Sequence, residues 1–370
     1  MMSNSTDNST GVWESAVPPS LQFVFGVLGN TIALVVLKLS AKTHQWRPFY
    51  RLVAALALTD GGGILLVYPT VMIRYATNFN FIMPAALCGY SSFIYSFTLL
   101  ASAMIICGMS IDRFFAILYP HMYNTNTKNK RVHIMLGVIW ITTAVLCSLH
   151  LFGLGGSHSF YPQSWCFIDF SNVATNDAPA KLNRANSFIY SIVGLIIIVS
   201  TVSLNSTVVF TICRKRFLVR RANSRSESQD HKRSIFNIVF LLAIVVVFTT
   251  CWTPLICVIF AHAALWIDGD GPTELLVLRL AVTNSIIDPW IYILLRMEMV
   301  LAIKRLFIHC IPCRISYGMN PPSSSDTRSS VTSLRMSDGS QMSLQITTGG
   351  SDGQTFPGTE RKSYPDKQPV

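Results

Sequence analysis

The sequence predicts an all-α membrane protein, a bundle of seven transmembrane helices with a short amphipathic helix after the seventh span. Two observations lead to this fold class. Of the 370 residues, 51% are hydrophobic and only 13% are charged, whereas about one-quarter of the residues of a soluble domain are charged. The hydrophobic residues also gather in seven long runs, separated by short segments that hold most of the basic residues. Much of the protein surface is therefore expected to face lipid.

Each run is long enough to cross a bilayer, which takes about 20 mostly apolar residues per helix. Because an unpaired backbone amide is costly in lipid, such runs favour helices. The sequence shows neither the short alternating segments of a β-barrel nor the internal repeats of many transporters. The predicted spans are Leu21–Leu39, Leu52–Tyr75, Leu87–Leu118, Val132–Leu154, Ala185–Cys213, Ser234–Leu265 and Glu274–Leu295.

The charges between the spans predict the orientation of the protein. The first, third and fifth connections are rich in Lys and Arg, whereas the last connection carries Asp268 and Asp270. Because cytosolic loops are enriched in Lys and Arg, the N-terminus is expected outside the cell and the C-terminus inside. The net charge of +11 belongs to these loops beside anionic lipid. No nucleic-acid motif accompanies the charge, so no nucleic-acid partner is expected.

Residues 1–17 are the predicted extracellular N-terminus and precede a seven-helix domain over residues 18–297. They lack the basic start and apolar block of a cleavable signal peptide, so the first helix is expected to act as the insertion signal. Asn4 and Asn8 each begin an Asn-x-Ser/Thr glycosylation acceptor. Such tripeptides arise by chance as well, but two in a short polar leader agree with the orientation that the charges predict.

Residues 298–313 mix apolar and basic residues, as expected of an amphipathic helix on the inner membrane surface. Cys310 and Cys313 in this segment are either palmitoylation sites or free cytosolic thiols. Residues 314–370 are rich in Ser, Thr, Gly and Pro without apolar periodicity, which predicts a disordered cytoplasmic tail. Phosphorylation of its hydroxyl groups would recruit partners.

Polar residues inside the spans are expensive in lipid and usually functional. Several of them form short motifs at the ends of the predicted helices. The motifs are Gly29-Asn30 in the first span, Asp60 in the second, Asp112-Arg113-Phe114 closing the third, Cys251-Trp252-Thr253-Pro254 in the sixth and Asp288-Pro289-Trp290-Ile291-Tyr292 closing the seventh.

In their order and position these motifs resemble those of the rhodopsin-like G-protein-coupled receptors over about residues 18–310. The third helix ends on a motif similar to D-R-Y, with Phe114 replacing Tyr, and the seventh on one similar to N-P-x-x-Y, with Asp288 replacing Asn. The sixth helix matches C-W-x-P. The resemblance implies a receptor of the plasma membrane that couples to a heterotrimeric G protein, and not an enzyme. Receptor kinases and arrestin are then the expected partners of the tail.

The residues of these motifs have the chemical properties that a two-state switch requires. Arg113 is able to pair with Asp112 or with a partner protein, and Pro254 permits a kink about which the sixth helix swings. Phe248 and Trp252, one turn apart, either report the ligand to this kink or pack as ordinary core residues. The residues assigned to coupling and switching are Asp112, Arg113, Phe248, Trp252, Pro254, Asp288, Pro289 and Tyr292.

The resemblance also implies a sodium site and a disulfide. The family holds a sodium ion in a polar cluster whose counterparts here are Asp60, Ser102, Asn284, Ser285 and Asp288. The alternative is that Asp60 is a structural hydrogen-bond hub, and no other metal or cofactor is expected. Cys88 and Cys166 correspond to two cysteines that pair in the family, and extracellular thiols favour such a bond.

Arg279 lies among leucines and valines in the outer half of the seventh span. A guanidinium there must face the bundle and pair with an anion. This anion is either a ligand carboxylate or a nearby acid such as Glu274. An amine ligand would need an acid at the same depth of the third helix, where Tyr95 stands instead. His262, near the outer end of the sixth span, is expected to face solvent.

Two segments sharpen the resemblance to the prostanoid receptors. Tyr161–Asp169 resembles their outer-loop signature, and Leu278–Arg296 resembles their seventh helix. In that family an Arg, a loop hydroxyl and a Tyr of the second helix bind the ligand carboxylate. The ligand-binding residues implied here are Arg279, Ser164, Tyr75, Trp165 and Ser285. The loop is most similar to the prostaglandin E2 receptors, in particular the fourth, stimulatory subtype, which implies prostaglandin E2 and a rise in cyclic AMP.

Three alternatives remain open at this stage. Cys251-Trp252 resembles the calcium-mobilising and inhibitory subtypes, which would mean another prostanoid or lipid carboxylate with different coupling. An organic-anion transporter would use Arg279 as its substrate site. An intramembrane enzyme would need a nucleophile–base or metal set inside the bundle, and the sequence offers no such grouping.

Overall fold

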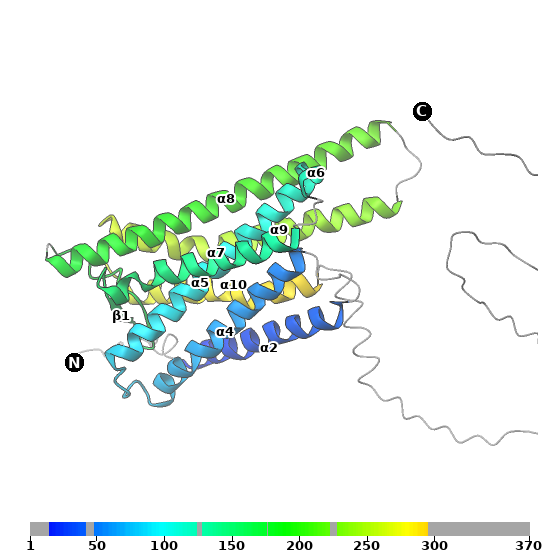
Figure 1. Ribbon diagram of the computed structural model, residues 1–370. Helices are drawn as coiled ribbons and strands as arrows, with labels where there is room; N and C mark the ends of the chain where they lie inside the picture. The colour runs from blue at the N-terminus through cyan, green and yellow to red at the C-terminus, as the bar shows by residue number, and fades with distance from the viewer. Residues whose placement is uncertain (1–14, 42–47, 124–127, 176, 223–227, 295–370) are drawn as a thin grey trace, which may run out of the picture. The chain divides into compact units, whose positions relative to one another are not determined.

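The computed structural model describes residues 15–41, 48–123, 128–175, 177–222 and 228–294, which all belong to one unit of the chain, Met1–Cys313. The predicted amphipathic helix, the tail, the glycosylation acceptors and both candidate palmitoylation cysteines lie outside the described residues. The elements are α2 (Val17–Leu39), α4 (Pro48–Ala76), α5 (Ala85–Leu118), α6 (Pro120–Tyr123), α7 (Lys128–Ser148), η1 (Leu149–Phe152), β1 (Ser157–Phe160), β2 (Trp165–Ile168), α8 (Ala178–Ala222), α9 (Ser228–Ala263) and α10 (Gly271–Leu294) (Figure 1).

Seven helices of the described part are long and apolar enough to cross a membrane, which confirms the predicted fold class. The helices run past the predicted ends: α4 begins at Pro48 instead of Leu52, and α8 continues beyond Cys213 to Ala222. Apolar runs mark only the part of a helix that lies in hydrocarbon, whereas the hydrogen-bonded backbone continues into the polar region. The fourth span ends earlier, because the backbone tightens into η1 and turns at Gly153, whose φ of 95° suits glycine.

Six of the seven long helices form a closed ring. α2 packs on α4, α4 on α5, α5 on α8, α8 on α9, α9 on α10, and α10 returns to α2. Helix α7 lies against α4 and α5 on the outside of this ring (Figure 1). The difference in burial is large, with 72% of the central part of α5 buried inside the protein against 28% for α7. Helix α5 is therefore the central helix, and its residues line sites at both ends of the bundle.

A two-stranded antiparallel hairpin, β1–β2, closes one end of the bundle, and the sequence did not predict it. Phe160 pairs with Trp165 at the turn, and Ser157 pairs with Ile168 at the open end. All four residues of β2 are buried, and the strand contacts α5. Because the hairpin is so short, its stability comes from packing on the helices and not from its own ladder.

Candidate ligand-binding site

A small cavity lies beneath the hairpin, between α2, α4, α5 and α10. Its volume is about 20 Å³, which is room for about one water molecule. The walls combine aliphatic and aromatic side chains with a few polar groups. The lining residues are Pro19, Gln22, Tyr68, Val71, Tyr75, Tyr95, Ser164, Trp165, Leu275, Leu278, Arg279 and Val282. Four of the five predicted ligand-binding residues therefore meet at one cavity, although they come from three separate parts of the chain.

The polar groups of the cavity centre on Arg279 of α10, which is half-buried. Its Nη2 donates a hydrogen bond to the hydroxyl of Tyr75 on α4, at 3.0 Å. Ser164, in the hairpin turn, donates to the same hydroxyl at 3.5 Å. Tyr75 and Ser164 are both buried. The three predicted donors thus form one continuous chain, and a carboxylate placed among them would accept hydrogen bonds from several at once.

Glu274 was the alternative partner for Arg279, and the structure gives its carboxylate another neighbour. Its Oε1 lies 3.3 Å from Nε2 of His262, and both side chains are almost fully buried. The expectation that His262 faces solvent is wrong: its side chain is buried, and the ring of Phe170, which follows the hairpin in the chain, lies 5.4 Å from the His262 ring. The error arises because a position near a helix end reveals nothing about the loop that folds over it.

Gln22 of α2 is a polar residue of the cavity that the sequence analysis did not single out. Its Nε2 donates to the backbone carbonyl of Arg279 at 3.0 Å, and its Oε1 accepts from the hydroxyl of Tyr68 at 2.9 Å. Its amide nitrogen also lies 3.4 Å from Oγ1 of Thr283. A side-chain amide near the start of the first apolar run was the available signal. Gln22 therefore links α2 to the backbone of Arg279 by a hydrogen bond.

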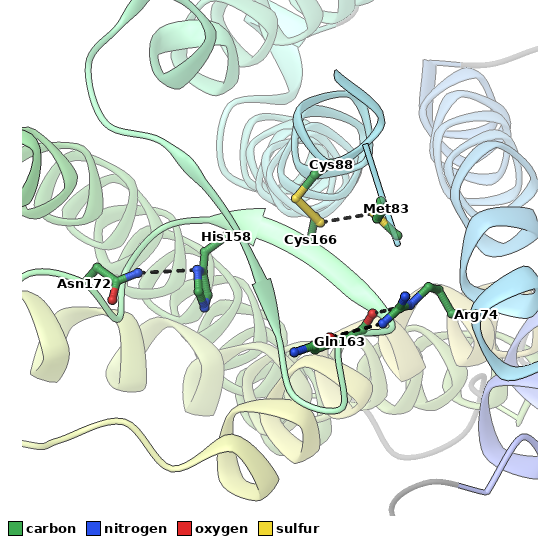
Figure 2. Close-up of a disulfide and its surroundings, with 7 residues drawn as sticks. All are labelled: Arg74, Met83, Cys88, His158, Gln163, Cys166 and Asn172. Atoms are coloured by element: carbon green, nitrogen blue, oxygen red, sulfur yellow. Dashed lines mark hydrogen bonds between the residues drawn. A yellow bond between two sulfur atoms is a disulfide. The ribbon is translucent and has the colours of Figure 1, made fainter. Parts of the chain in front are cut away.

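The hairpin is fastened over the cavity at two places, shown in Figure 2. The predicted disulfide between Cys88 of α5 and Cys166 of β2 is confirmed. At the turn, Arg74 of α4 donates from Nε to the carbonyl of Gln163 at 2.7 Å. Ser164 sits between these two fastenings, so its hydroxyl is held toward Tyr75 by contacts on both sides.

Trp165 contributes its ring to the cavity wall. Its indole Nε1 donates to the carbonyl of Tyr161 at 2.9 Å, and the ring stacks on Phe160 at 4.7 Å. Because the indole N–H already donates a hydrogen bond within the loop, the surface that Trp165 presents to the cavity is apolar.

Ser285 lies deeper than the other predicted ligand-binding residues and is absent from the walls of the first cavity. It lines a second cavity of about 10 Å³, which shares Tyr68, Tyr95 and Val282 with the first. Its hydroxyl donates to Oδ1 of Asp60 at 2.8 Å. The two cavities are therefore neighbours along the bundle, and Ser285 connects the lower one to the polar core.

The polar core brings together all the residues predicted for a sodium ion. Oδ1 of Asp60 also accepts a hydrogen bond from Ser102, and Asn284 donates to Oδ2 of Asp288 at 2.8 Å. Buried oxygen atoms without a hydrogen-bond partner among the described residues point to a further ligand of this cluster. These atoms are Asp60 Oδ2, Asp288 Oδ1, Asn284 Oδ1 and Asn30 Oδ1. Carboxylate and amide oxygens are the ligands that a hard cation prefers, so the donor set fits sodium.

The opposite end of the bundle carries the predicted switch pair. Arg113 donates to Oδ2 of Asp112 at 2.8 Å, and its guanidinium lies over the ring of Phe49, 4.4 Å from the centroid. Tyr123 of α6 donates to the other carboxylate oxygen of Asp112 at 2.7 Å. Burial, and then the negative charge of Asp112, raise the pKa of Tyr123 above its ordinary value. The hydroxyl therefore keeps its proton and remains a donor to Asp112.

Comparison with known proteins identifies the arrangement. The family described as 7 transmembrane receptor (rhodopsin family) matches residues 29–292. The chain belongs to the rhodopsin family of seven-transmembrane receptors. This receptor is 31% identical to the human prostaglandin E2 receptor EP4 subtype over 336 residues, which cover 80% of this chain and 67% of that protein. It is also 31% identical to the bovine prostacyclin receptor, over 89% of this chain and 85% of that protein.

A solved structure agrees with the fold. The crystal structure of squid rhodopsin superposes with a TM-score of 0.65 at 20% identity, and the match covers 82% of this chain and 87% of rhodopsin. At that identity the match supports the fold alone. The family match and the two prostanoid relatives make the chain a prostanoid-type receptor of the plasma membrane, which is not an enzyme.

The remaining switch residues of the receptor lie in the interior. Phe248 and Trp252 of α9 are fully buried and stack at 5.7 Å, and both precede Pro254 in the helix. On α10, Tyr292 packs edge-on against Phe49 at 6.4 Å, the ring that also carries Arg113. Their positions are compatible with both hypotheses, a relay and ordinary core packing, so their switching role stays a prediction.

Proposed function

We propose that the receptor binds prostaglandin E2 and raises cyclic AMP through a stimulatory G protein. The observation that carries the proposal is the chain of donors Arg279, Tyr75 and Ser164 at the wall of an otherwise largely apolar cavity. Prostaglandin E2 is a lipid with one carboxylate and two alkyl chains. One charge-assisted contact would hold the head, and burial of the chains among aliphatic and aromatic side chains would supply the remaining affinity.

The ligand would enter by displacing side chains. Pockets for molecules of this size measure about 300–1,000 Å³, whereas the two cavities measure about 20 and 10 Å³. Tyr68 and Tyr95 line both cavities, so a movement of these two rings would join them into one longer pocket. A ligand extending down this pocket would approach Ser285, which hydrogen-bonds to Asp60 in the polar core.

Signalling would run from this pocket to the Asp112–Arg113 end. The excess of Lys and Arg in the first, third and fifth connections supports a cytosolic position for that end and an extracellular position for the cavity. The same orientation places residues 1–17 outside, with acceptors at Asn4 and Asn8. It places the Ser/Thr-rich residues 314–370 inside, where receptor kinases would phosphorylate the hydroxyl groups and the phosphorylated tail would recruit arrestin.

Prostacyclin is the second candidate ligand, because the bovine prostacyclin receptor matches more of the chain at the same identity. A prostanoid panel separates the two. In transfected cells, we expect prostaglandin E2 to raise cyclic AMP at lower concentrations than a stable prostacyclin analogue does, without a calcium signal. A response to the prostacyclin analogue alone would show that the ligand is prostacyclin and not prostaglandin E2. A fall in cyclic AMP or a calcium signal would show that the receptor does not couple to a stimulatory G protein. Untransfected cells provide the baseline.

A sodium ion at Asp60 is proposed as an allosteric ligand, supported by the orphan oxygens of the polar core. A ligand that binds only the folded protein raises its stability. We therefore expect the unfolding temperature of the purified receptor to be higher in sodium chloride than in choline chloride of equal ionic strength. Asp60→Asn removes the anionic ligand and should abolish the difference. An equal sodium effect in wild type and variant would leave Asp60 as a structural hub only.

A further inference from the structure

A third and larger cavity lies at the Asp112–Arg113 end of the bundle, between α5, α6 and α7. Its volume is about 370 Å³, which falls in the range of sites that hold small organic molecules. No part of the prostanoid hypothesis uses it. Its walls combine apolar side chains with three polar ones. Among the described residues the lining includes Ile111, Phe115 and Met135, together with Asp112, Tyr123 and Arg131.

This cavity adjoins the lipid-facing flank of the receptor. Ile111 and Phe115 are 36% and 43% exposed, although they belong to α5, the most buried of the spanning helices. The other wall is α7, the least buried span. Ile111 and Phe115 lie within the apolar span Ala85–Leu118, and Met135 lies within Lys130–Phe152. We therefore expect the exposed surface of these side chains to meet acyl chains instead of water.

The charges around the cavity favour an occupant with an anionic group. Asp112 is balanced by Arg113 at 2.8 Å and by the hydroxyl of Tyr123 at 2.7 Å. The exposed Arg131 lines the cavity, and the exposed Lys130 precedes it in the chain. A guanidinium carries several N–H donors, so it can hold a phosphate in addition to a protein neighbour. An apolar recess with a cationic mouth fits an acyl chain that carries an anionic head.

We propose that this cavity binds an anionic phospholipid of the cytosolic leaflet. The acyl chain lies against Ile111, Phe115 and Met135, and the phosphate group lies at Arg131. Basic pockets between transmembrane helices on the cytoplasmic side are suited to such head groups. The assignment to the cytosolic leaflet rests on the orientation proposed above. The binding of an anionic phospholipid in this cavity does not depend on that orientation. Because Asp112 and its hydrogen-bond donor Tyr123 both line the cavity, the bound lipid contacts one member of the switch pair.

The test uses the full-length receptor in nanodiscs of phosphatidylcholine with a trace of photoactivatable phosphatidylserine. Labelling of peptides from α5 and α7 is measured while unlabelled phosphatidylserine is added as competitor. We expect saturable labelling in wild type. Arg131→Gln should raise the half-saturating concentration about fivefold, the effect expected for one basic residue near the membrane surface. Ile111→Trp, which fills the recess without altering charge, should reduce labelling by a similar factor.

Matched controls come from the same helices or the same end of the bundle. Arg214→Gln removes an exposed charge from α8, and Ile134→Trp enlarges an exposed side chain of α7, each outside the cavity lining. Both should leave labelling unchanged. The proposal is overturned if these controls lose as much labelling as Arg131→Gln and Ile111→Trp, or if photoactivatable phosphatidylcholine labels the same peptides equally. The assay contains neither prostanoid nor G protein, so its failure leaves the prostaglandin proposal intact.

Discussion

Replacing Arg279 with alanine is expected to weaken prostaglandin E2 binding by about 2–5 kcal/mol, or at least about thirtyfold in Kd. The guanidinium is the cationic group of the cavity wall, held by its hydrogen bond to Tyr75 and by the contact of its backbone carbonyl with Gln22. Without it the ligand carboxylate would lie in a largely apolar cavity with only neutral donors. Saturation binding of radiolabelled prostaglandin E2 to membranes measures the change.

Two further variants make this experiment specific. Arg279→Lys keeps the charge but lacks the planar fork, so it should recover only part of the affinity. Arg184→Ala removes an arginine of α8 whose Nε donates to the carbonyl of Ala263, away from the cavity. That variant should bind prostaglandin E2 as wild type does. Wild-type affinity in Arg279→Ala would show that the carboxylate is held elsewhere and would remove the basis for a prostanoid ligand.

Removing the disulfide should have the second largest effect. In the double variant Cys88→Ala, Cys166→Ala, we expect the affinity for prostaglandin E2 to fall by about tenfold or more, because a disulfide contributes about 2–4 kcal/mol to the order of the segment it closes. Ser164 lies two residues before Cys166, and the hydroxyl of Ser164 reaches Tyr75 only while the hairpin is in place. Thermal unfolding and radioligand binding on the same preparation measure the two consequences.

The hairpin retains other fastenings, so the loss should be partial and distinguishable from misfolding. Arg74 still holds the carbonyl of Gln163, and Trp165 still donates to Tyr161. Cys257→Ala, at an exposed free thiol of α9, is the matched control and should change neither quantity. A reducing agent applied to wild type should reproduce the effect of the double variant. If the double variant bound ligand normally, the hairpin would be held by its packing alone.

Much of the fold could be predicted because bilayer insertion depends on local composition. Seven apolar runs of sufficient length correspond to the seven observed spans, although several helices extend past the predicted ends. Arg279 could be singled out for the same reason, since a guanidinium among leucines and valines must be compensated somewhere. The disulfide was implied only through family resemblance, because spacing along the chain does not determine which cysteines pair.

Contacts between distant segments could not be predicted in the same way. Gln22 and Arg279 are separated by 257 positions and meet only because α2 closes the ring against α10. The burial of His262 beside Glu274 could not be read from the sequence, because it depends on Phe170, which the segment after the hairpin places against the ring. Ser285 was assigned both to the ligand-binding residues and to the sodium site, and only the folded bundle shows that its hydroxyl lies on Asp60, 225 positions away.

By itself, the sequence determined which segments are helices in lipid and which charged group among apolar neighbours needs a compensating partner. These properties follow from transfer energies of single residues and short runs, which do not depend on the rest of the fold. The tertiary structure alone decided which side chains face one another across the bundle, including the approach of Tyr75 and Ser164 to Arg279 and the cavity beside Arg131. Packing between helices sets these contacts, and it depends on the relative rotation and depth of elements far apart in the chain.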